Sequence, residues 1–251
     1  MISEQDTLRP GWPAPDRIRA LSTTRKGGAS QPPWDSLNLG VHVGDDPDHV
    51  ARNRQILADF TGLAASNIGW LNQVHGTDVV ELTPDNVDAV ATADASFTRH
   101  PGIACAILTA DCLPVILTNA SGTVIGAAHA GWRSLCGGVL EHLITAMAVR
   151  PSDLKAWLGP AIGPEHFEVG PEVRQSFIDQ SPDGAQAFTP NGARSGHFMA
   201  DIYRLATQRL NNAGVVSVSG GGLCTVNDKD RFYSYRRDGQ TGRMATLVWL
   251  D

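Results

Sequence analysis

Apolar residues recur along this chain with two spacings, one typical of helices and one typical of buried strands. Leu135, Val139, Leu143 and Met147 follow one another at intervals of four positions, which places them on one face of a helix. Residues 103–108 (IACAIL) form a short continuous apolar run, as in strands buried on both faces. Helices are predicted over residues 48–60, 134–149, 171–179 and 201–211. Strands are predicted over residues 17–21, 68–74, 78–82, 103–109, 115–118, 124–129, 155–158, 215–219, 232–235 and 244–250.

Helical and extended segments alternate without a repeat, a low-complexity segment or a change in composition that would indicate a linker. With 251 residues and 42% hydrophobic content, the chain is long enough to bury a full core. We therefore expect one α/β domain over residues 1–251.

Charge and cysteine usage exclude several classes of protein. A net charge of −6 without a basic cluster argues against a nucleic-acid partner. The first 20 residues mix charges with prolines and lack the apolar core of a signal peptide, which predicts a cytoplasmic protein. No run approaches the roughly 20 apolar residues that cross a bilayer, so no membrane partner is expected. The four cysteines are irregularly spaced, and we expect reduced thiols.

Three residues at the ends of hydrophobic runs form a candidate metal centre: His75, Cys112 and His129. Two imidazoles and a thiolate suit zinc, and three protein ligands leave a fourth position open for water or substrate. Their intervals match no zinc-finger repeat, and buried histidines and cysteines are also common core residues. If they are ligands, three strand ends of one sheet are expected to bring them together, with Asp111 next to the ligands.

Other polar segments offer binding groups without deciding between uses. Residues 24–28 (TRKGG) combine cations with glycines and suit an anion, although an ordinary surface turn is the more frequent explanation of such a segment. Asp94 and Asp111 either orient a metal-bound histidine or cap turns. The Arg236–Arg237 pair beside Tyr235 suits an anion or a ring, or is a solvated face. Neither a Walker A motif nor a dinucleotide fingerprint follows a predicted strand.

Eleven short motifs occur in an order that resembles one known family. They are STTRKGG (22–28), SLNLG (36–40), VGDDP (43–47), RNR (52–54), QVHG (73–76), ADA (93–95), ADCLP (110–114), AHAGWR (128–133), LGPAIG (158–163), FYSYRR (232–237) and TGR (241–243). The chain thereby resembles the laccase-domain or polyphenol-oxidase family. Members of this family are associated with purine nucleoside phosphorylase activity and, in bacteria, with a peptidoglycan editing factor.

The resemblance implies an α/β sandwich with a mixed sheet, similar to the fold of toxin deamidases that use a cysteine and a histidine. It also implies zinc, with copper as the earlier assignment, on His75, Cys112 and His129. The implied reactions are phosphorolysis of adenosine, inosine, guanosine and methylthioadenosine, and deamination of adenosine. The expected partners are thus a purine nucleoside and phosphate.

The remaining roles follow from what these reactions require. Phosphorolysis needs a bound phosphate and a proton for the departing purine, and we assign the phosphate to Arg25 or Arg52. Asn38 and Gln73 are candidates for the sugar or base, and Asp111 for an acid or base.

Two other enzymes and a binding module remain as alternatives. A peptidoglycan-precursor hydrolase would use zinc or the Cys112 thiolate, with His129 as base. A copper polyphenol oxidase is disfavoured, because multicopper sites need about ten histidines and the chain has eight. A binding module would hold zinc without turnover.

Overall fold

The computed structural model describes residues 2–251, and its helices and strands alternate along the chain. The helices are α1 (Pro47–Thr61), α2 (Trp132–Gly137), α3 (Val139–Met147), α4 (Pro171–Gln180), α5 (Ile202–Asn212) and α6 (Tyr235–Asp238), with 3-10 turns at Glu4–Asp6, Ala65–Asn67, Pro151–Asp153 and Pro182–Ala187. The strands are β1 (Thr7–Leu8), β2 (Ile18–Thr23), β3 (Ile68–Gly69), β4 (Leu71–Asn72), β5 (Val79–Glu81), β6 (Ala91–Thr92), β7 (Ala95–Thr98), β8 (Ala104–Thr109), β9 (Leu113–Asn119), β10 (Ile125–Ala130), β11 (Leu154–Leu158), β12 (Glu168–Val169), β13 (Phe188–Thr189), β14 (Phe198–Ala200), β15 (Ser217–Gly220) and β16 (Met244–Leu250).

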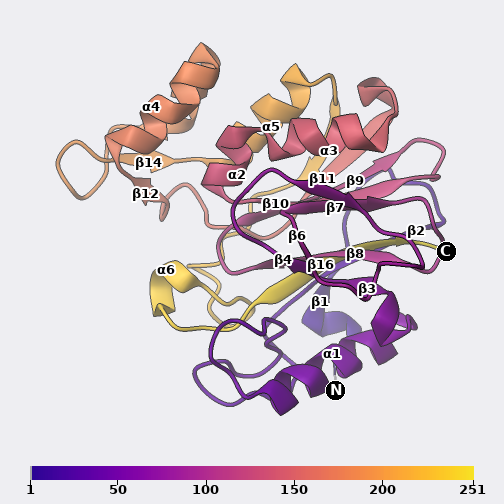
Figure 1. Cartoon of the computed structure of the whole chain (residues 1–251). Coiled ribbons are helices and arrows are strands. Elements are labelled where there is room, and N and C mark those ends of the chain that lie inside the picture. Colours follow the sequence, from indigo (N-terminus) through magenta and orange to yellow (C-terminus); the bar gives the residue numbers. More distant parts are fainter. Residues whose placement is uncertain (1) are drawn as a thin grey trace.

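Two mixed sheets form the centre of the molecule (Figure 1). One has the strand order β1-β2-β16-β8-β3 and the other β15-β11-β9-β10-β7-β5. The pairs β3–β8, β11–β15 and β5–β7 are parallel, whereas most other neighbours are antiparallel. Ile107 on β8 and Ile116 and Ile125 on β9 and β10 belong to one buried cluster, so the two sheets share an apolar interface.

Helices cover the outer face of each sheet (Figure 1). Leu57 of α1 packs with residues of β2, β8 and β16, while α3 and α5 contribute Leu143 and Leu205 to the cluster on the other sheet. The central strands of the two sheets are therefore buried on both faces, once by a helix layer and once by the second sheet. This explains why β8, β9, β10 and β16 are buried along their whole length and read as continuous apolar runs.

Most predicted elements are confirmed, and three are wrong. The helix predicted over residues 134–149 is two helices, because Gly138 takes the left-handed conformation (φ 100°) and ends α2. The strand predicted over 232–235 is irregular chain that leads into α6. The strand predicted over 68–74 pairs only in the short pieces β3 and β4, and the residues after Asn72 turn away to form a loop.

The connection from β8 to β9 joins the two main sheets, because β8 belongs to one and β9 to the other. Residues 110–112 make this crossing, and Asp111 adopts φ 95°, which is rare for a residue with a side chain. The crossing places Cys112 at the end of the interface between the sheets. Among residues 2–251, no helix combines the length and apolar character that a membrane span requires.

Candidate metal centre and active site

His75, Cys112 and His129 lie together, with one ligand atom from each within 4.8 Å of the others. The Cys112 Sγ is 3.8 Å from His75 Nε2, and the two imidazole rings meet edge to face with centroids 4.8 Å apart. The prediction that three strand ends of one sheet meet here is wrong. His75 follows β4 of a two-stranded sheet, Cys112 precedes β9, and His129 lies within β10.

Asp94 holds both histidines of this cluster through hydrogen bonds. Its buried carboxylate accepts hydrogen bonds from the backbone N–H groups of Val74, His75 and Gly76, and from His129 Nδ1 at 2.8 Å. Because Nδ1 of His129 donates to Asp94, its Nε2 is the nitrogen available to a ligand. The three backbone bonds also hold the loop on which His75 adopts φ 61°. One side chain therefore sets the geometry of both histidines.

The charges within the cluster stabilise a thiolate and an imidazolium. Burial opposes both charged forms, but the charge and hydrogen bonds of the neighbouring imidazoles lower the pKa of Cys112 to about 6. The negative charge of Cys112 and the hydrogen bond to Asp94 raise the pKa of His129 to about 9. Burial also opposes the Asp94 carboxylate, yet the hydrogen bonds from His129 and the backbone hold the pKa of Asp94 below its usual range.

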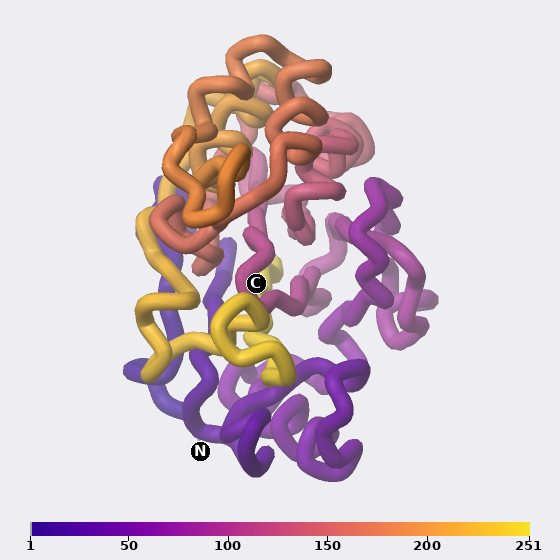
Figure 2. Tube along the Cα trace, turned by 90° about the vertical axis from the view of Figure 1, so that its left-hand side faces the viewer, coloured from indigo at the N-terminus to yellow at the C-terminus, as the bar shows by residue number. Residues whose placement is uncertain are grey.

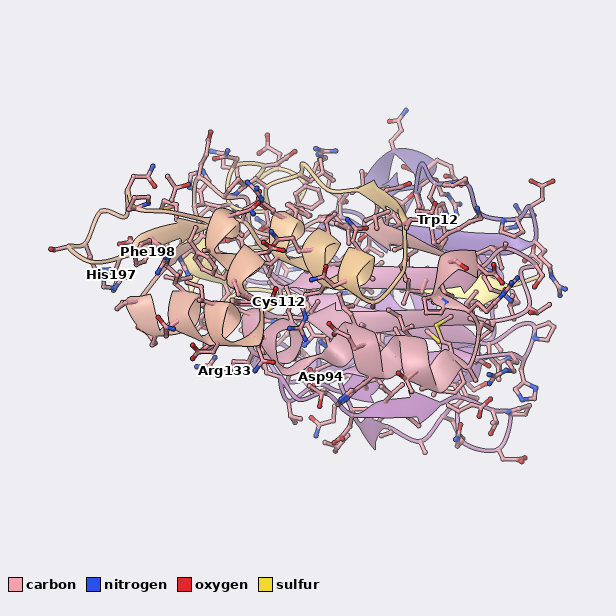
Figure 3. The ribbon with its side chains drawn as sticks, turned by 90° about the horizontal axis from the view of Figure 1, so that it is seen from above. Trp12, Asp94, Cys112, Arg133, His197 and Phe198 are labelled. Carbon is pink, nitrogen blue, oxygen red and sulfur yellow. The ribbon has the colours of Figure 1, made fainter. Side chains whose placement is uncertain are left out.

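A pocket of about 260 Å³ opens over the cluster. It is lined by His42, Gln73, His75, Leu108, Thr109, Ala110, Cys112, His129, Tyr235 and Arg243. Tyr235 comes from α6, in the yellow C-terminal segment on the side of the molecule that faces the viewer in Figure 2. In Figure 3, Cys112 and Asp94 lie between Trp12 on one side and His197 and Phe198 on the other. The pocket is slightly smaller than the roughly 300–1,000 Å³ typical of ligand sites.

Sequence reasoning assigned no role in this pocket to His42, Tyr235 or Arg243. His42 and Arg243 lie far from the histidine and cysteine motifs in sequence. Arg243 ends the TGR motif, whereas His42 falls between the SLNLG and VGDDP motifs and had no signal of its own. Partial burial and the charges of Arg243 and Arg54 lower the pKa of His42, so its imidazole is neutral at pH 7. Of His42 and Arg243, only Arg243 therefore carries a positive charge into the pocket lining at pH 7.

Two predicted site residues serve the loops around the pocket. Asp111 accepts hydrogen bonds from the Thr225 hydroxyl and the Arg236 backbone N–H. Its carboxylate therefore connects two loops and is not hydrogen-bonded to either imidazole of the cluster. Gln73 lines the pocket, but its amide pairs with both the N–H and the carbonyl of Leu108. It thereby fixes the loop to β8.

The three other predicted binding residues lie outside the pocket lining. Arg25 donates to the Asp35 and Lys229 carbonyls and to the Asp35 carboxylate, and Arg52 is exposed on α1. Asn38 is buried. Its side-chain amide donates to the Gly40 carbonyl and the Asp45 carboxylate, and it accepts a hydrogen bond from the Arg243 backbone N–H. The structure does not bring these three residues to the cluster.

Comparison with known proteins identifies relatives over nearly the whole chain. Residues 19–251 match the model of a family described as multi-copper polyphenol oxidoreductase laccase. The chain belongs to this family. Family members at high identity include a purine nucleoside phosphorylase of Pseudomonas aeruginosa, 54% identical over 97% of this chain and 98% of that protein. The purine nucleoside phosphorylase YfiH of Escherichia coli is 51% identical over 96% of this chain and 97% of its own.

Solved structures of similar proteins have the same fold. A Neisseria meningitidis protein superimposes with a TM-score of 0.93 at 49% identity, covering 98% of this chain and 99% of its own. YlmD of Geobacillus stearothermophilus gives 0.92 at 31% identity, covering 100% and 98%. The mixed α/β architecture is therefore shared with experimentally determined relatives.

The donor atoms of this laccase-family cluster fit a metal ion. Two ligands on one zinc are separated by no more than the sum of their bond lengths, about 4.3 Å for a sulfur and a nitrogen. Cys112 Sγ and His75 Nε2, 3.8 Å apart, meet this limit, and the three donor atoms together lie within 4.8 Å of one another. The thiol favours the deprotonated form that a metal requires. His75, Cys112 and His129 are thus a set that can hold a metal ion.

Gly131 leaves room for these ligands, and a side chain there is expected to weaken metal binding. A Cβ at this position would lie 3.0 Å from His75 Cδ2 and 3.1 Å from Cys112 Sγ. For Gly131→Ala we expect zinc affinity to fall by roughly tenfold, measured by competition with a chromophoric chelator. Gly11→Ala is the matched control, because nothing lies within 4 Å of its added carbon. Equal zinc affinity in both variants would contradict this account of the cluster.

Proposed function

We propose that this protein is a zinc-dependent purine nucleoside phosphorylase that acts on adenosine, inosine, guanosine and methylthioadenosine. The observation that carries the proposal is the His75, Cys112 and His129 cluster at the base of a pocket, in a chain whose relatives at 51–54% identity are named purine nucleoside phosphorylases. Zinc on these ligands would supply a Lewis acid beside the substrate.

The residues around the pocket suit phosphorolysis. An oxygen of phosphate bonds to C1′ of the ribose, the bond from C1′ to purine N9 breaks with its electron pair going to the purine, and the purine takes up a proton. The products are the free base and ribose 1-phosphate. The incoming phosphate needs positive charge, and the residues that line the pocket include the guanidinium of Arg243. The neutral imidazole of His42 offers the purine a hydrogen-bond donor on the same wall.

Adenosine deamination is the proposed second reaction of this site. It needs water in place of phosphate, so the two reactions compete for one bound nucleoside. Raising the phosphate concentration is expected to shift the products of adenosine from inosine towards adenine.

A second candidate function is hydrolysis by the Cys112 thiolate, for example of a peptidoglycan precursor, as in the cysteine and histidine sites of toxin deamidases. The lowered pKa of Cys112 and raised pKa of His129 form the pair that a thiol nucleophile requires. Copper oxidation of phenols is a third candidate, because a thiolate with two imidazoles also suits copper. A chelated protein that retains full activity would favour the thiol, and phenol oxidation that needs copper would favour the oxidase.

The experiment that tests the proposed function is product analysis with purified metal-loaded protein. Inosine or adenosine is incubated with phosphate, and the products are separated by chromatography. We expect free base and ribose 1-phosphate in equal amounts, formed only when phosphate is present, and no turnover by His75→Ala. No free base at catalytic protein concentrations would exclude the phosphorylase.

Tyr235 is expected to hold the purine by stacking. Its ring lines the pocket and is 62% exposed, and an aromatic ring contributes roughly 1–3 kcal/mol per stacked base. Tyr235→Ala should therefore raise the KM for inosine by roughly tenfold, whereas Tyr235→Phe should keep the wild-type value. Steady-state kinetics at saturating phosphate measures both. An unchanged KM in Tyr235→Ala would show that the base lies elsewhere.

A further inference from the structure

One residue that lines the pocket, Arg243, carries a guanidinium with free hydrogen-bonding capacity. Arg243 donates through Nη1 to the carbonyls of Thr241 and Gly242. Within residues 2–251, neither Nε nor Nη2 of Arg243 has an acceptor, and no carboxylate forms an ion pair with it. This edge of the guanidinium is therefore free, and the side chain lines the pocket together with His75 and Cys112.

The position of this arginine is built by its neighbours. The buried amide of Asn38 accepts a hydrogen bond from the Arg243 backbone N–H at 2.8 Å. Gly40 has no side chain where the arginine stem passes, since a Cβ there would lie 2.8 Å from Arg243 Cγ. The first contact holds the Arg243 backbone, and the missing side chain at Gly40 leaves space for the arginine stem.

Other arginines near the pocket lack this freedom. Arg54 stacks over the Trp70 ring at 4.1 Å and donates from Nε and Nη2 to the Leu39 carbonyl. Arg237 donates to the carbonyls of Thr225 and Phe232 and to Asp238. Nε and Nη2 of Arg54 and Arg237 have acceptors within the protein, whereas Nε and Nη2 of Arg243 remain available to a ligand.

We propose that Arg243 is the phosphate-binding residue of this pocket, with its Nε and Nη2 edge directed at two oxygens of a phosphate group. A guanidinium binds such a group through two parallel hydrogen bonds and keeps its charge at all physiological pH values. Partial burial increases the strength of these bonds. This inference rests on the proposed phosphorylase function for its role, but binding of phosphate is a separate and separately measurable property.

The test is binding of inorganic phosphate to chelated, metal-free protein by isothermal titration calorimetry, so that neither turnover nor a metal contributes. Wild-type protein should bind one phosphate per chain, and Arg243→Met should bind at least about tenfold more weakly. Arg150→Met is the matched control, because Arg150 is 82% exposed and pairs with Asp153 outside the pocket, and it should bind like wild type. Equal weakening in both variants, or none in Arg243→Met, would overturn the proposal.

Two further variants keep the test decisive if Arg243→Met does not fold. Arg243→Lys retains the charge but loses the two parallel donors of the guanidinium, so we expect a phosphate affinity between those of wild type and Arg243→Met. Gly40→Ala displaces the arginine stem without removing the charge, and it should also weaken phosphate binding. Wild-type affinity in both of these folded variants would contradict the assigned role.

Separate arms identify the source of the phosphate group and the role of the proposed function. If the group is free phosphate, inosine and phosphate bind together, whereas a nucleoside 5′-monophosphate displaces phosphate if the group belongs to a nucleotide. Phosphate binding that depends on Arg243 in a protein without nucleoside cleavage would retain the subsite and reject the phosphorylase. Phosphorolysis with an unchanged KM for phosphate in Arg243→Met would retain the phosphorylase and reject the subsite.

Discussion

Asp94→Asn is expected to destabilise the protein and disable the metal centre together. Each carboxylate oxygen of Asp94 accepts two hydrogen bonds, Oδ1 from His75 N–H and His129 Nδ1, and Oδ2 from Val74 N–H and Gly76 N–H. An asparagine replaces one oxygen by a donor, so two of these four donors lose their acceptor whichever way the amide turns. We expect a stability loss of about 3 kcal/mol by urea unfolding and zinc affinity lower by about a hundredfold.

The pH dependence of this loss has a definite sign. The pKa of Asp94 is lower in the folded protein than in the unfolded chain. Its contribution to stability is therefore present above the unfolded value of about 3.9 and disappears as the pH falls through the folded value. The difference between wild type and Asp94→Asn should narrow at low pH. Asp88→Asn, an exposed aspartate on a neighbouring loop, is the control and should unfold like wild type at pH 7.

Cys112 of the metal-free protein should react with iodoacetamide with a half-maximal rate near pH 6. His129 and His75 lower the pKa of this thiol to about 6, whereas burial raises the pKa of Cys105 to about 12. At pH 6 the reaction should be roughly a hundredfold faster than that of a thiol with an ordinary pKa near 8.5, apart from differences in nucleophilicity. Peptide mass spectrometry assigns the modified residue.

His129→Gln provides the control for this measurement, because it removes the positive charge and one hydrogen bond from the thiolate. The pH of half-maximal reaction should rise towards 8.5. Zinc added to wild-type protein should block the reaction by occupying the sulfur. A wild-type profile centred near pH 8.5 would show that the cluster does not stabilise a thiolate.

The sequence predicted the cluster residues because chemistry and position agree in them. His75, Cys112 and His129 each follow a hydrophobic run, and the apolar pattern of β8, β10 and β16 predicted strands that the structure contains. The pattern of apolar residues did not show which strands belong to which of the two sheets. The run over 103–109 and the run over 115–118 read alike, although the chain changes sheets between them. Helix boundaries failed where one glycine, Gly138, determines the break.

Residues that act through long-range contacts were harder to predict. Arg243 reaches the pocket because Asn38, 205 positions earlier, holds its backbone, and no local spacing encodes such a contact. Asn38 was predicted to contact the substrate, but its buried amide serves the protein. Asp94 and Asp111 gave the same expectation from sequence, and only their hydrogen bonds distinguish the residue that orients His129 from the one that joins loops.

Zinc titration of the metal-free protein, followed by formation of ribose 1-phosphate from inosine and phosphate, tests the central claim most directly. We predict that activity rises in proportion to added zinc and reaches its maximum at one zinc per chain, and that Cys112→Ser and His75→Ala stay inactive at the same concentrations. Full phosphorolysis without metal, or no ribose 1-phosphate when one zinc per chain is bound, would contradict the account.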